Sequence, residues 1–292
     1  MNLLQAIIMG IVQGITEFLP VSSSGHLTIL KNMFGMKDVK ITFDLMLHFG
    51  TLVAIFIVFW KDILWLIGSG LGIIRDSVLN VITYFKSVKK GGRKLPYRKV
   101  ISNQYRKFTW MVIVSTIPTG IIGYTFEKSF PMDNMGLLVP GICLFITAVL
   151  LMVADKCPGG SKLPNDVTYT NAFSIGIVQG LATLPGISRS GSTIAACLIS
   201  GFDKKFAVKY SFIMSIPAVL GAVVLKLGDL SQDALSKGEI ACYGVGTIVS
   251  AVVGYFCIRI MLKLVKERKF KYFAYYCIAV GVFSIVAFFV RL

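Results

Sequence analysis

Residues 10–26 read Gly10-Ile-Val-Gln13-Gly-Ile-Thr-Glu17-Phe-Leu-Pro20-Val-Ser22-Ser23-Ser24-Gly25-His26 and lie within an otherwise apolar N-terminal segment. This stretch brings together an amide, a carboxylate, three consecutive serine hydroxyls and one of the chain's two histidines. Polar and ionisable side chains at membrane depth are costly, so in a membrane protein they indicate a functional site.

The same stretch returns in altered form 166 residues further along the chain, as Gly176-Ile-Val-Gln179-Gly180 followed by Ser188-Arg189-Ser190-Gly191. The second copy has neither the carboxylate nor the histidine, but it carries an arginine between its two serines. We interpret the two copies as two halves of one anion-handling site.

The composition of the chain excludes a soluble globular protein. Of its 292 residues, 55% are hydrophobic and only 15% are charged, and its mean hydropathy is +0.76. Several apolar runs approach the ~20 residues that a helix needs to cross a bilayer. We therefore predict an all-α polytopic membrane protein surrounded by membrane lipids. The N-terminus lacks the pattern of a cleavable signal peptide, because Gln13 and Glu17 interrupt its apolar run and no basic residue precedes it.

The basic residues give the chain a net charge of +16. They cluster between the apolar segments, as the positive-inside rule expects of cytoplasmic loops, so we predict no nucleic-acid partner. The six cysteines are widely scattered and form no C-x-x-C pair, which argues against a zinc site or a redox dithiol. We interpret them as small packing residues.

Six apolar segments are predicted to span the membrane, and they are 41–60, 108–126, 136–154, 206–227, 240–262 and 272–290. Two further apolar segments, 2–34 and 172–201, are broken by polar, proline and glycine residues. We predict that each forms a re-entrant hairpin of two short helices, since irregular backbone at membrane depth is tolerated only where protein or water covers it. The alternative for the first segment is one kinked spanning helix over 2–30.

The basic segment 61–107 sets the orientation of the chain. We assign it to the cytoplasm as a loop, with an apolar first part (63–74) that lies along the interface as an amphipathic helix. The span 41–60 must then run from outside to inside, whereas its counterpart 206–227 begins beside a cluster of lysines and must run from inside to outside. This opposite polarity defines an inverted-topology repeat, which places binding sites near the membrane midplane at the repeat interface.

These assignments predict a single membrane domain over 1–292. Its first repeat covers 1–154 and its second covers 172–292, with a polar linker between them. The first hairpin is expected to dip into the membrane from the outside and the second from the inside.

Gln13 and Glu17 are four residues apart, so on a helix they share one face. A carboxylate beside an amide can hold a hard cation such as Mg²⁺, which accepts a few oxygen ligands and keeps several waters. One carboxylate makes a weak metal site, so bound phosphate would have to complete the coordination. The alternative is that Gln13 and Glu17 only tie two helices together by hydrogen bonds.

The serine runs of both copies precede predicted helices. A Ser/Gly-rich break at a helix N-terminus offers backbone N–H groups to an anion, although such a serine is more often simply an N-cap. Arg189 lies between apolar helices and needs an anionic partner, and bidentate binding of phosphate is a frequent role of arginine. The alternative partner of Arg189 is Glu17, in a salt bridge that locks the two halves together.

The two histidines are assigned different roles. His26 lies within one helical turn of the serines, close enough to activate a hydroxyl or to act as the nucleophile itself, unless it is a packing residue. His48 follows Asp44 at helical spacing, and we expect this pair to form a structural hydrogen bond rather than a relay.

Two motifs together carry a resemblance to a known family. The stretch 13–26 and the stretch Pro185-Gly-Ile-Ser188-Arg189-Ser190-Gly191-Ser192 resemble the two signature motifs of the bacterial undecaprenyl-diphosphate phosphatases, also called the bacitracin-resistance family. Phe43-Asp44…His48-Phe49-Gly50-Thr51 and 211–217 resemble further stretches of that family, so the resemblance covers nearly the whole chain. It implies six spanning helices and two re-entrant hairpins in the bacterial plasma membrane.

The resemblance also implies the activity. It is hydrolysis of the C55 lipid diphosphate to the monophosphate carrier on the outer face, which recycles the carrier for peptidoglycan synthesis and confers bacitracin resistance. A divalent cation, Mg²⁺ or Ca²⁺, is expected to assist. By motif position the residues that match the catalytic residues of the family are Glu17, Ser23, His26 and Arg189. Gln13 stands where many members carry a glutamate, which leaves Glu17 as the expected metal ligand.

We expect the remaining polar groups and glycines of the two motifs to bind the diphosphate, and they are Gln13, Ser22, Ser24, Gly25, Ser188, Ser190 and Gly191. Our hypothesis is that Ser23 attacks the terminal phosphorus while His26 takes its proton, with His26 as nucleophile the alternative. Arg189 and a cation held by Glu17 would neutralise the phosphate oxygens.

A flippase or another anion-handling secondary transporter is the alternative function, because inverted repeats with broken helices are also used by transporters. The oligomeric state is left open.

Overall fold

The structure, a computed structural model, describes residues 1–36, 39–89, 95–129, 136–157, 159–225, 236–267 and 269–290. These residues form eleven α-helices and one short 3-10 helix, η2 (Val265–Glu267). The first half contains α1 (Leu3–Phe18), α2 (Ser23–Met33), α3 (Ile41–Val58), α4 (Trp60–Lys89), α5 (Gln104–Ser129) and α6 (Leu138–Lys156). The second half contains α7 (Tyr169–Leu181), α8 (Arg189–Ile199), α9 (Lys204–Leu225), α11 (Lys237–Leu264) and α12 (Phe270–Val290). The predicted all-α class is confirmed.

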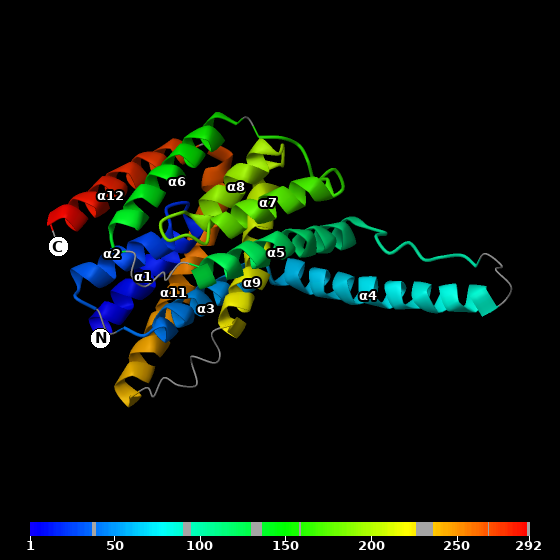
Figure 1. The fold of residues 1–292 in the computed structure, drawn as a ribbon, viewed down its shortest axis with the longest axis horizontal. Helices are drawn as coiled ribbons and strands as arrows, with labels where there is room; N and C mark the ends of the chain where they lie inside the picture. The colour runs from blue at the N-terminus through cyan, green and yellow to red at the C-terminus, as the bar shows by residue number, and fades with distance from the viewer. Residues whose placement is uncertain are drawn as a thin grey trace.

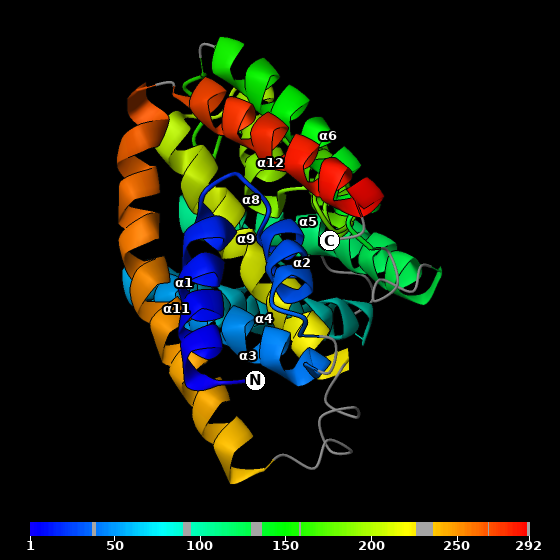
Figure 2. The same ribbon diagram turned by 90° about the vertical axis from the view of Figure 1, so that its left-hand side faces the viewer.

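Both predicted hairpins are present. In Figure 2, α1 and α2 lie next to each other and are joined by a short turn at one end, and the two helices are in contact. The same holds for α7 and α8. Ser22 has a φ of 69°, in the region that favours glycine, and the chain reverses direction there. The alternative of one kinked helix over 2–30 is therefore wrong.

The two halves pack on each other reciprocally. Helix α1 packs along α11 of the second half, its counterpart α7 packs along α5 of the first half, and α6 packs on α12. The contact between α1 and α11 is close because a Cβ added at Gly10 would lie 2.6 Å from the carbonyl oxygen of Gly246. Small residues that let two backbones approach are typical of helix contacts in membranes, where lipid tails are as apolar as the side chains.

Helix α4 differs from the prediction. The segment 61–107 was expected to be a cytoplasmic loop with a short interfacial helix, but the structure has a helix of 30 residues there, which extends sideways from the other helices in Figure 1. Apolar residues continue at helical spacing through Val78, Val81 and Phe85, and this pattern was hidden by the basic residues around it. Residues 90–94 of the predicted loop lie outside the described residues.

Seven described helices are long and apolar enough to cross a membrane: the six predicted spans, which correspond to α3, α5, α6, α9, α11 and α12, and in addition α4. The chain is thus a multi-pass membrane protein by length and composition of its helices. Beneath the first hairpin lies an aromatic contact in which Phe18 and Phe212 meet edge to face, with ring centroids 5.3 Å apart. Because Phe18 directly follows Glu17, this contact fixes the end of α1 against α9.

Candidate active site

The turns of the two hairpins meet in the middle of the molecule. The Ser24 hydroxyl accepts a hydrogen bond from the backbone N–H of Gly186 (3.3 Å), and the Ser190 hydroxyl donates to the carbonyl of Leu19 (3.4 Å). A Cβ on Gly25 would lie 3.2 Å from the Cα of Gly186. The predicted convergence of the two copies is therefore present, and the serine two residues after the capping serine of each motif holds the two turns together.

The first hydroxyl of each motif caps a helix. Ser22 accepts a hydrogen bond from the N–H of Gly25 at the start of α2, and Ser188 accepts one from the N–H of Gly191 at the start of α8. These bonds satisfy N–H groups that have no partner within the helix. The N-cap interpretation of both serines is confirmed, and their role in binding substrate stays a prediction.

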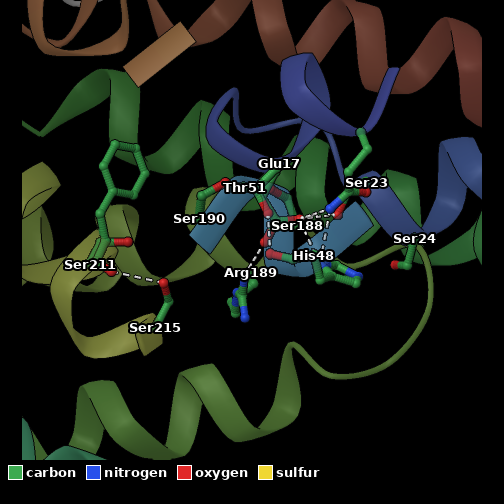
Figure 3. A network of polar contacts seen from close by, with 12 residues as sticks. Glu17, Ser23, Ser24, His48, Thr51, Ser188, Arg189, Ser190, Ser211 and Ser215 are labelled. Atoms are coloured by element: carbon green, nitrogen blue, oxygen red, sulfur yellow. Dashed lines mark hydrogen bonds and ion pairs between the residues drawn. The ribbon is translucent and has the colours of Figure 1, made fainter. Parts of the chain in front are cut away.

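Ser23 and Arg189 occupy the same position in the two copies, since each is the first residue of its helix after the cap. Both side chains contact Glu17, which belongs to the end of α1 (Figure 3). The Arg189 guanidinium forms an ion pair with Glu17 Oε1. The Ser23 hydroxyl donates a hydrogen bond of 2.6 Å to Glu17 Oε2. The salt bridge to Glu17, which was the alternative given for Arg189, is therefore present, and it places the guanidinium on the same carboxylate as the Ser23 hydroxyl.

Glu17 has two further neighbours on the side opposite Arg189. Gln13 Nε2 donates to Glu17 Oε2 at 3.1 Å and lies 3.0 Å from His48 Nδ1. His48 Nδ1 is itself 3.5 Å from Glu17 Oε2. The side chain of Glu17 is only 5% exposed, whereas those of His48 and Arg189 are 29% and 25% exposed. The carboxylate is thus enclosed by groups that fix its position and stabilise its charge.

The pairing of Ser23 with His26 is wrong in this structure. His26 Nδ1 lies 2.7 Å from the carbonyl of Ser22, and its Nε2 lies 2.8 Å from the hydroxyl of Tyr276. The imidazole also stacks on the Tyr276 ring, with centroids 5.5 Å apart. Both ring nitrogens are therefore engaged by groups other than Ser23, because the ring turns back along its own helix toward α12.

The pairing of His48 with Asp44 is also wrong. Asp44 forms an ion pair with Lys31, with an N–O distance of 2.5 Å, while His48 turns toward Gln13 and Glu17. Helical spacing brought the two residues to one face of α3, but each found a stronger partner on a neighbouring helix. His48 is therefore a site residue that the sequence interpretation had placed outside the site.

The site is closed in this structure. A cavity of about 10 Å³ lies beside the ion pair and is lined by Glu17, Phe18, Arg189, Ser190, Ser211, Phe212 and Ser215. A cavity of this size holds about one water molecule. Figure 3 shows Ser211 and Ser215 on α9 on the other side of the site from Ser23. This cavity is too small for a phosphate group, so side chains that line it would have to move before such an anion enters.

The donor atoms at Glu17 fit a divalent cation only in part. Among the described residues, no three histidine, cysteine, aspartate or glutamate side chains are grouped as metal ligands. Gln13 Oε1, however, is buried without a hydrogen-bond partner in the described part of the chain. A carboxylate and an amide oxygen are ligand types that a hard cation accepts, but the amide nitrogen of Gln13, not its oxygen, faces Glu17, so phosphate oxygens and waters would have to complete the coordination.

Comparison with known proteins identifies the family of the chain. The family model described as "Bacitracin resistance protein BacA" matches residues 6–283. The chain belongs to the BacA family. A protein named undecaprenyl-diphosphatase from Methanosphaera stadtmanae is 40% identical over 98% of both chains. Proteins of the same name from Alkaliphilus metalliredigens (40% identical over 96% of this chain and 97% of the relative) and Halothermothrix orenii (37% identical over 98% of both) are similarly close.

Membership of the BacA family confirms the resemblance that the two motifs indicated. It also shows which signal could have found His48: the stretch Phe43-Asp44…His48-Phe49-Gly50-Thr51 already resembled a BacA stretch, yet His48 was expected to form a structural hydrogen bond with Asp44. In the structure α3 brings this stretch against Gln13 and Glu17.

Proposed function

We propose that this BacA family member is an integral membrane phosphatase that hydrolyses undecaprenyl diphosphate to undecaprenyl phosphate and inorganic phosphate. Its relatives are named for this activity. The observation that carries the proposal is the contact of Glu17 with both Ser23 and Arg189. A phosphoryl-transfer site requires a hydroxyl, a base and a positively charged group that binds an anion, and Ser23, Glu17 and the Arg189 guanidinium supply them in one place.

In the first step, the Ser23 oxygen attacks the terminal phosphorus and Glu17 takes the hydroxyl proton. The geometry supports Glu17 rather than His26 as the base, because the hydroxyl already donates to its carboxylate at 2.6 Å. The bond between the terminal phosphorus and the bridging oxygen breaks, and the lipid monophosphate leaves. A water molecule then hydrolyses the phosphoserine, which releases inorganic phosphate and restores Ser23.

Arg189 has two partners in turn in this scheme. In the closed site it neutralises Glu17. When the diphosphate enters, the guanidinium moves to the phosphate oxygens, for which its planar fork is well suited. This exchange frees Glu17 Oε1 from the guanidinium when substrate is bound, while Oε2 stays in contact with the Ser23 hydroxyl and accepts its proton. Gln13 and His48 hold the carboxylate in place during the exchange.

A divalent cation, Mg²⁺ or Ca²⁺, is part of the proposal. Glu17 would hold it together with phosphate oxygens and waters. When bound, it supplies further neutralisation of the charge that develops on the phosphate oxygens. We further propose that the protein lies in the bacterial plasma membrane with the site open to the outer side, where it recycles the lipid carrier for cell-wall synthesis and confers resistance to bacitracin.

The test is release of inorganic phosphate from undecaprenyl diphosphate by purified protein in detergent with Mg²⁺. Wild-type protein is expected to release phosphate, and Ser23→Ala protein is not. Thr28→Ala is the matched control, because it removes a hydroxyl from the same helix that, within the described part of the chain, bonds only to the Ser24 carbonyl. A protein that releases no phosphate in detergent, but moves a polyprenyl phosphate across sealed vesicles, would be a transporter instead.

A further inference from the structure

A large apolar groove lies beside the active site, on the outer surface of α3. Its volume is about 670 Å³, and it is lined by six residues between Phe49 and Trp60 together with Leu220 of α9. Every lining residue is apolar. Phe49, Val53, Phe56 and Trp60 follow one another at helical spacing along a single face. The six lining residues of α3 and its end, together with Leu220, form what we call the α3–α9 groove.

The groove begins where the polar site reaches the surface. His48, whose side chain is 29% exposed, lies four residues before the groove residue Leu52, so the two side chains share one face of α3. Thr51, whose hydroxyl bonds to the His48 carbonyl at 2.8 Å, directly precedes the groove residue Leu52. Helix α9 connects the two sites in the same way, because Ser215 lines the small polar cavity and Leu220 lines the groove.

The two helices that form the groove are antiparallel. Lys209 near the start of α9 lies 2.8 Å from Asp62, just beyond the end of α3. Leu220 therefore lies near the part of α3 that contains Thr51 and Leu52, rather than near Trp60. The end of the groove that both helices line is the end closest to Glu17 and His48.

We propose that the α3–α9 groove binds the first isoprene units of the polyprenyl tail while the diphosphate occupies the Glu17–Arg189 site. This inference rests on the proposed function, and it adds the path by which a membrane lipid reaches a buried polar site. The substrate enters sideways from the bilayer, with its head group passing His48 and its tail lying along Phe49, Val53 and Phe56. A volume of about 670 Å³ is within the ~300–1,000 Å³ of ordinary ligand pockets, so the far end of a long tail stays in the bilayer.

The groove distinguishes the polyprenyl tail of the substrate from other lipid tails by shape and by position, and not by hydrophobicity. Lipid tails are as apolar as the groove, so moving a tail from the bilayer into it releases little free energy. The gain lies in fixing the first units of the tail, which places the diphosphate against Ser23 and Arg189. A phospholipid tail receives no such anchor, since its head group is held elsewhere.

The first experiment uses a prenyl diphosphate that carries a photoreactive diazirine on its first isoprene units. After irradiation of the purified protein in lipid nanodiscs, the labelled peptides are expected to come from residues 49–60 and from the part of α9 around Leu220. Excess undecaprenyl diphosphate should abolish the labelling. Labelling on other helices, or labelling that phospholipid removes but undecaprenyl diphosphate does not, would overturn the proposal.

The second experiment narrows the groove. Leu220→Trp is compared with Ile146→Trp, which adds the same bulk at a similarly exposed lipid-facing position of α6 (46% exposed, against 41% for Leu220). With a prenyl diphosphate as substrate, Leu220→Trp is expected to lower kcat/KM by roughly tenfold, and Ile146→Trp to leave it unchanged. With methyl diphosphate, which has the same head group and no tail, neither variant should change kcat/KM.

The other outcomes are decisive as well. If Leu220→Trp lowers the rates with both substrates equally, it has distorted the head-group site and the groove does not bind the tail. If it changes neither rate, the tail lies elsewhere. A second copy of the chain in the groove would show as a dimer cross-linked through Val53→Cys, and this would also overturn the proposal. If wild-type protein releases no phosphate from any diphosphate, it is the proposed function that fails.

Discussion

At the residue scale, Ser23 and Arg189 show how two copies of one motif supply different functional groups to one site. Each is the first residue of a helix and follows a capping serine, so the duplicated backbone presents two side chains to one carboxylate from opposite directions. The change from a hydroxyl to a guanidinium at this single position gives one copy a nucleophile and the other an anion-binding group. Glu17 is needed in one copy only, and Thr183 takes its place in the other.

The positions of Ser23 and His26 lead to opposite predictions for their alanine variants. Ser23→Ala should lower single-turnover hydrolysis of undecaprenyl diphosphate by at least about a thousandfold, as expected for loss of a nucleophile. His26→Ala should retain most of the rate and lose ~1 kcal/mol of stability, because it removes a hydrogen bond to Tyr276 and not a contact with Ser23. Rapid-quench kinetics and thermal unfolding measure the two effects. Normal chemistry in Ser23→Ala, or loss of chemistry in an equally stable His26→Ala, would reverse the assignment.

Gln13 offers a test of the cation. Its Nε2 lies 3.1 Å from Glu17 Oε2 and 3.0 Å from His48 Nδ1, so Gln13→Glu places a second carboxylate beside Glu17. Two carboxylates bind a hard cation more tightly than one. We expect the Mg²⁺ concentration for half-maximal phosphate release to fall, and EDTA to abolish the activity of both proteins. A variant whose activity is independent of Mg²⁺, or needs more of it, would show that the cation is held elsewhere.

At the scale of helices, the close approach of the two hairpin turns holds the site together. Gly186 has a φ of 96°, and a Cβ there would lie 2.4 Å from the carbonyl oxygen of Pro140. Its N–H also donates to Ser24. This position therefore depends on glycine for its backbone conformation and for its lack of a side chain.

Gly186→Ala is expected to destabilise the protein by ~1–3 kcal/mol and to lower activity, because the two turns move apart and Arg189 moves away from Glu17. Gly120→Ala is the control. Its Cβ would have no neighbour within 4 Å on α5, so it should raise the free energy of unfolding by ~0.5–1 kcal/mol. Thermal unfolding and phosphate release in detergent measure both variants. Equal stability of the two variants would contradict the packing described for the turns.

The hairpins and spans could be predicted because each depends on local pattern. Runs of apolar residues marked the spans, and Pro20, the serines and the glycines marked the breaks between short helices. The contact of Glu17 with Arg189 was foreseen as the alternative to phosphate binding, because a buried arginine and a buried carboxylate each need a partner. The partners of the two histidines were not foreseen. His26 turns to Tyr276, 250 residues away, and no local spacing encodes such a contact.

At the scale of the whole molecule, the reciprocal packing of α1 on α11 and of α7 on α5 agrees with two halves of opposite polarity. The boundaries of the two repeats, 1–154 and 172–292, stay predictions. Helix α4 has no counterpart of its length between α9 and α11 in the described residues, and it shows where counting basic residues misled the sequence interpretation. Charge alone marked the side of the membrane but not the extent of the helix.

The orientation of the chain can be tested with two cysteine variants of a protein whose own cysteines are replaced. Lys99→Cys, in the basic segment, should react with a membrane-impermeant thiol reagent only after the cells are opened. Ser129→Cys, at the end of α5, should react in intact cells. Both positions are exposed. The positive-inside rule gives this orientation, and the reverse labelling pattern would place the basic segment outside.

The most direct test of the account asks whether the two hairpins act on the same diphosphate. A double-mutant cycle of Ser23→Ala and Arg189→Ala on kcat/KM for undecaprenyl diphosphate answers this. Residues that stabilise one transition state together are strongly non-additive, so the double variant should be about as slow as the slower single variant. Losses that multiply independently, or an Arg189→Ala protein as active as wild type, would contradict a shared site.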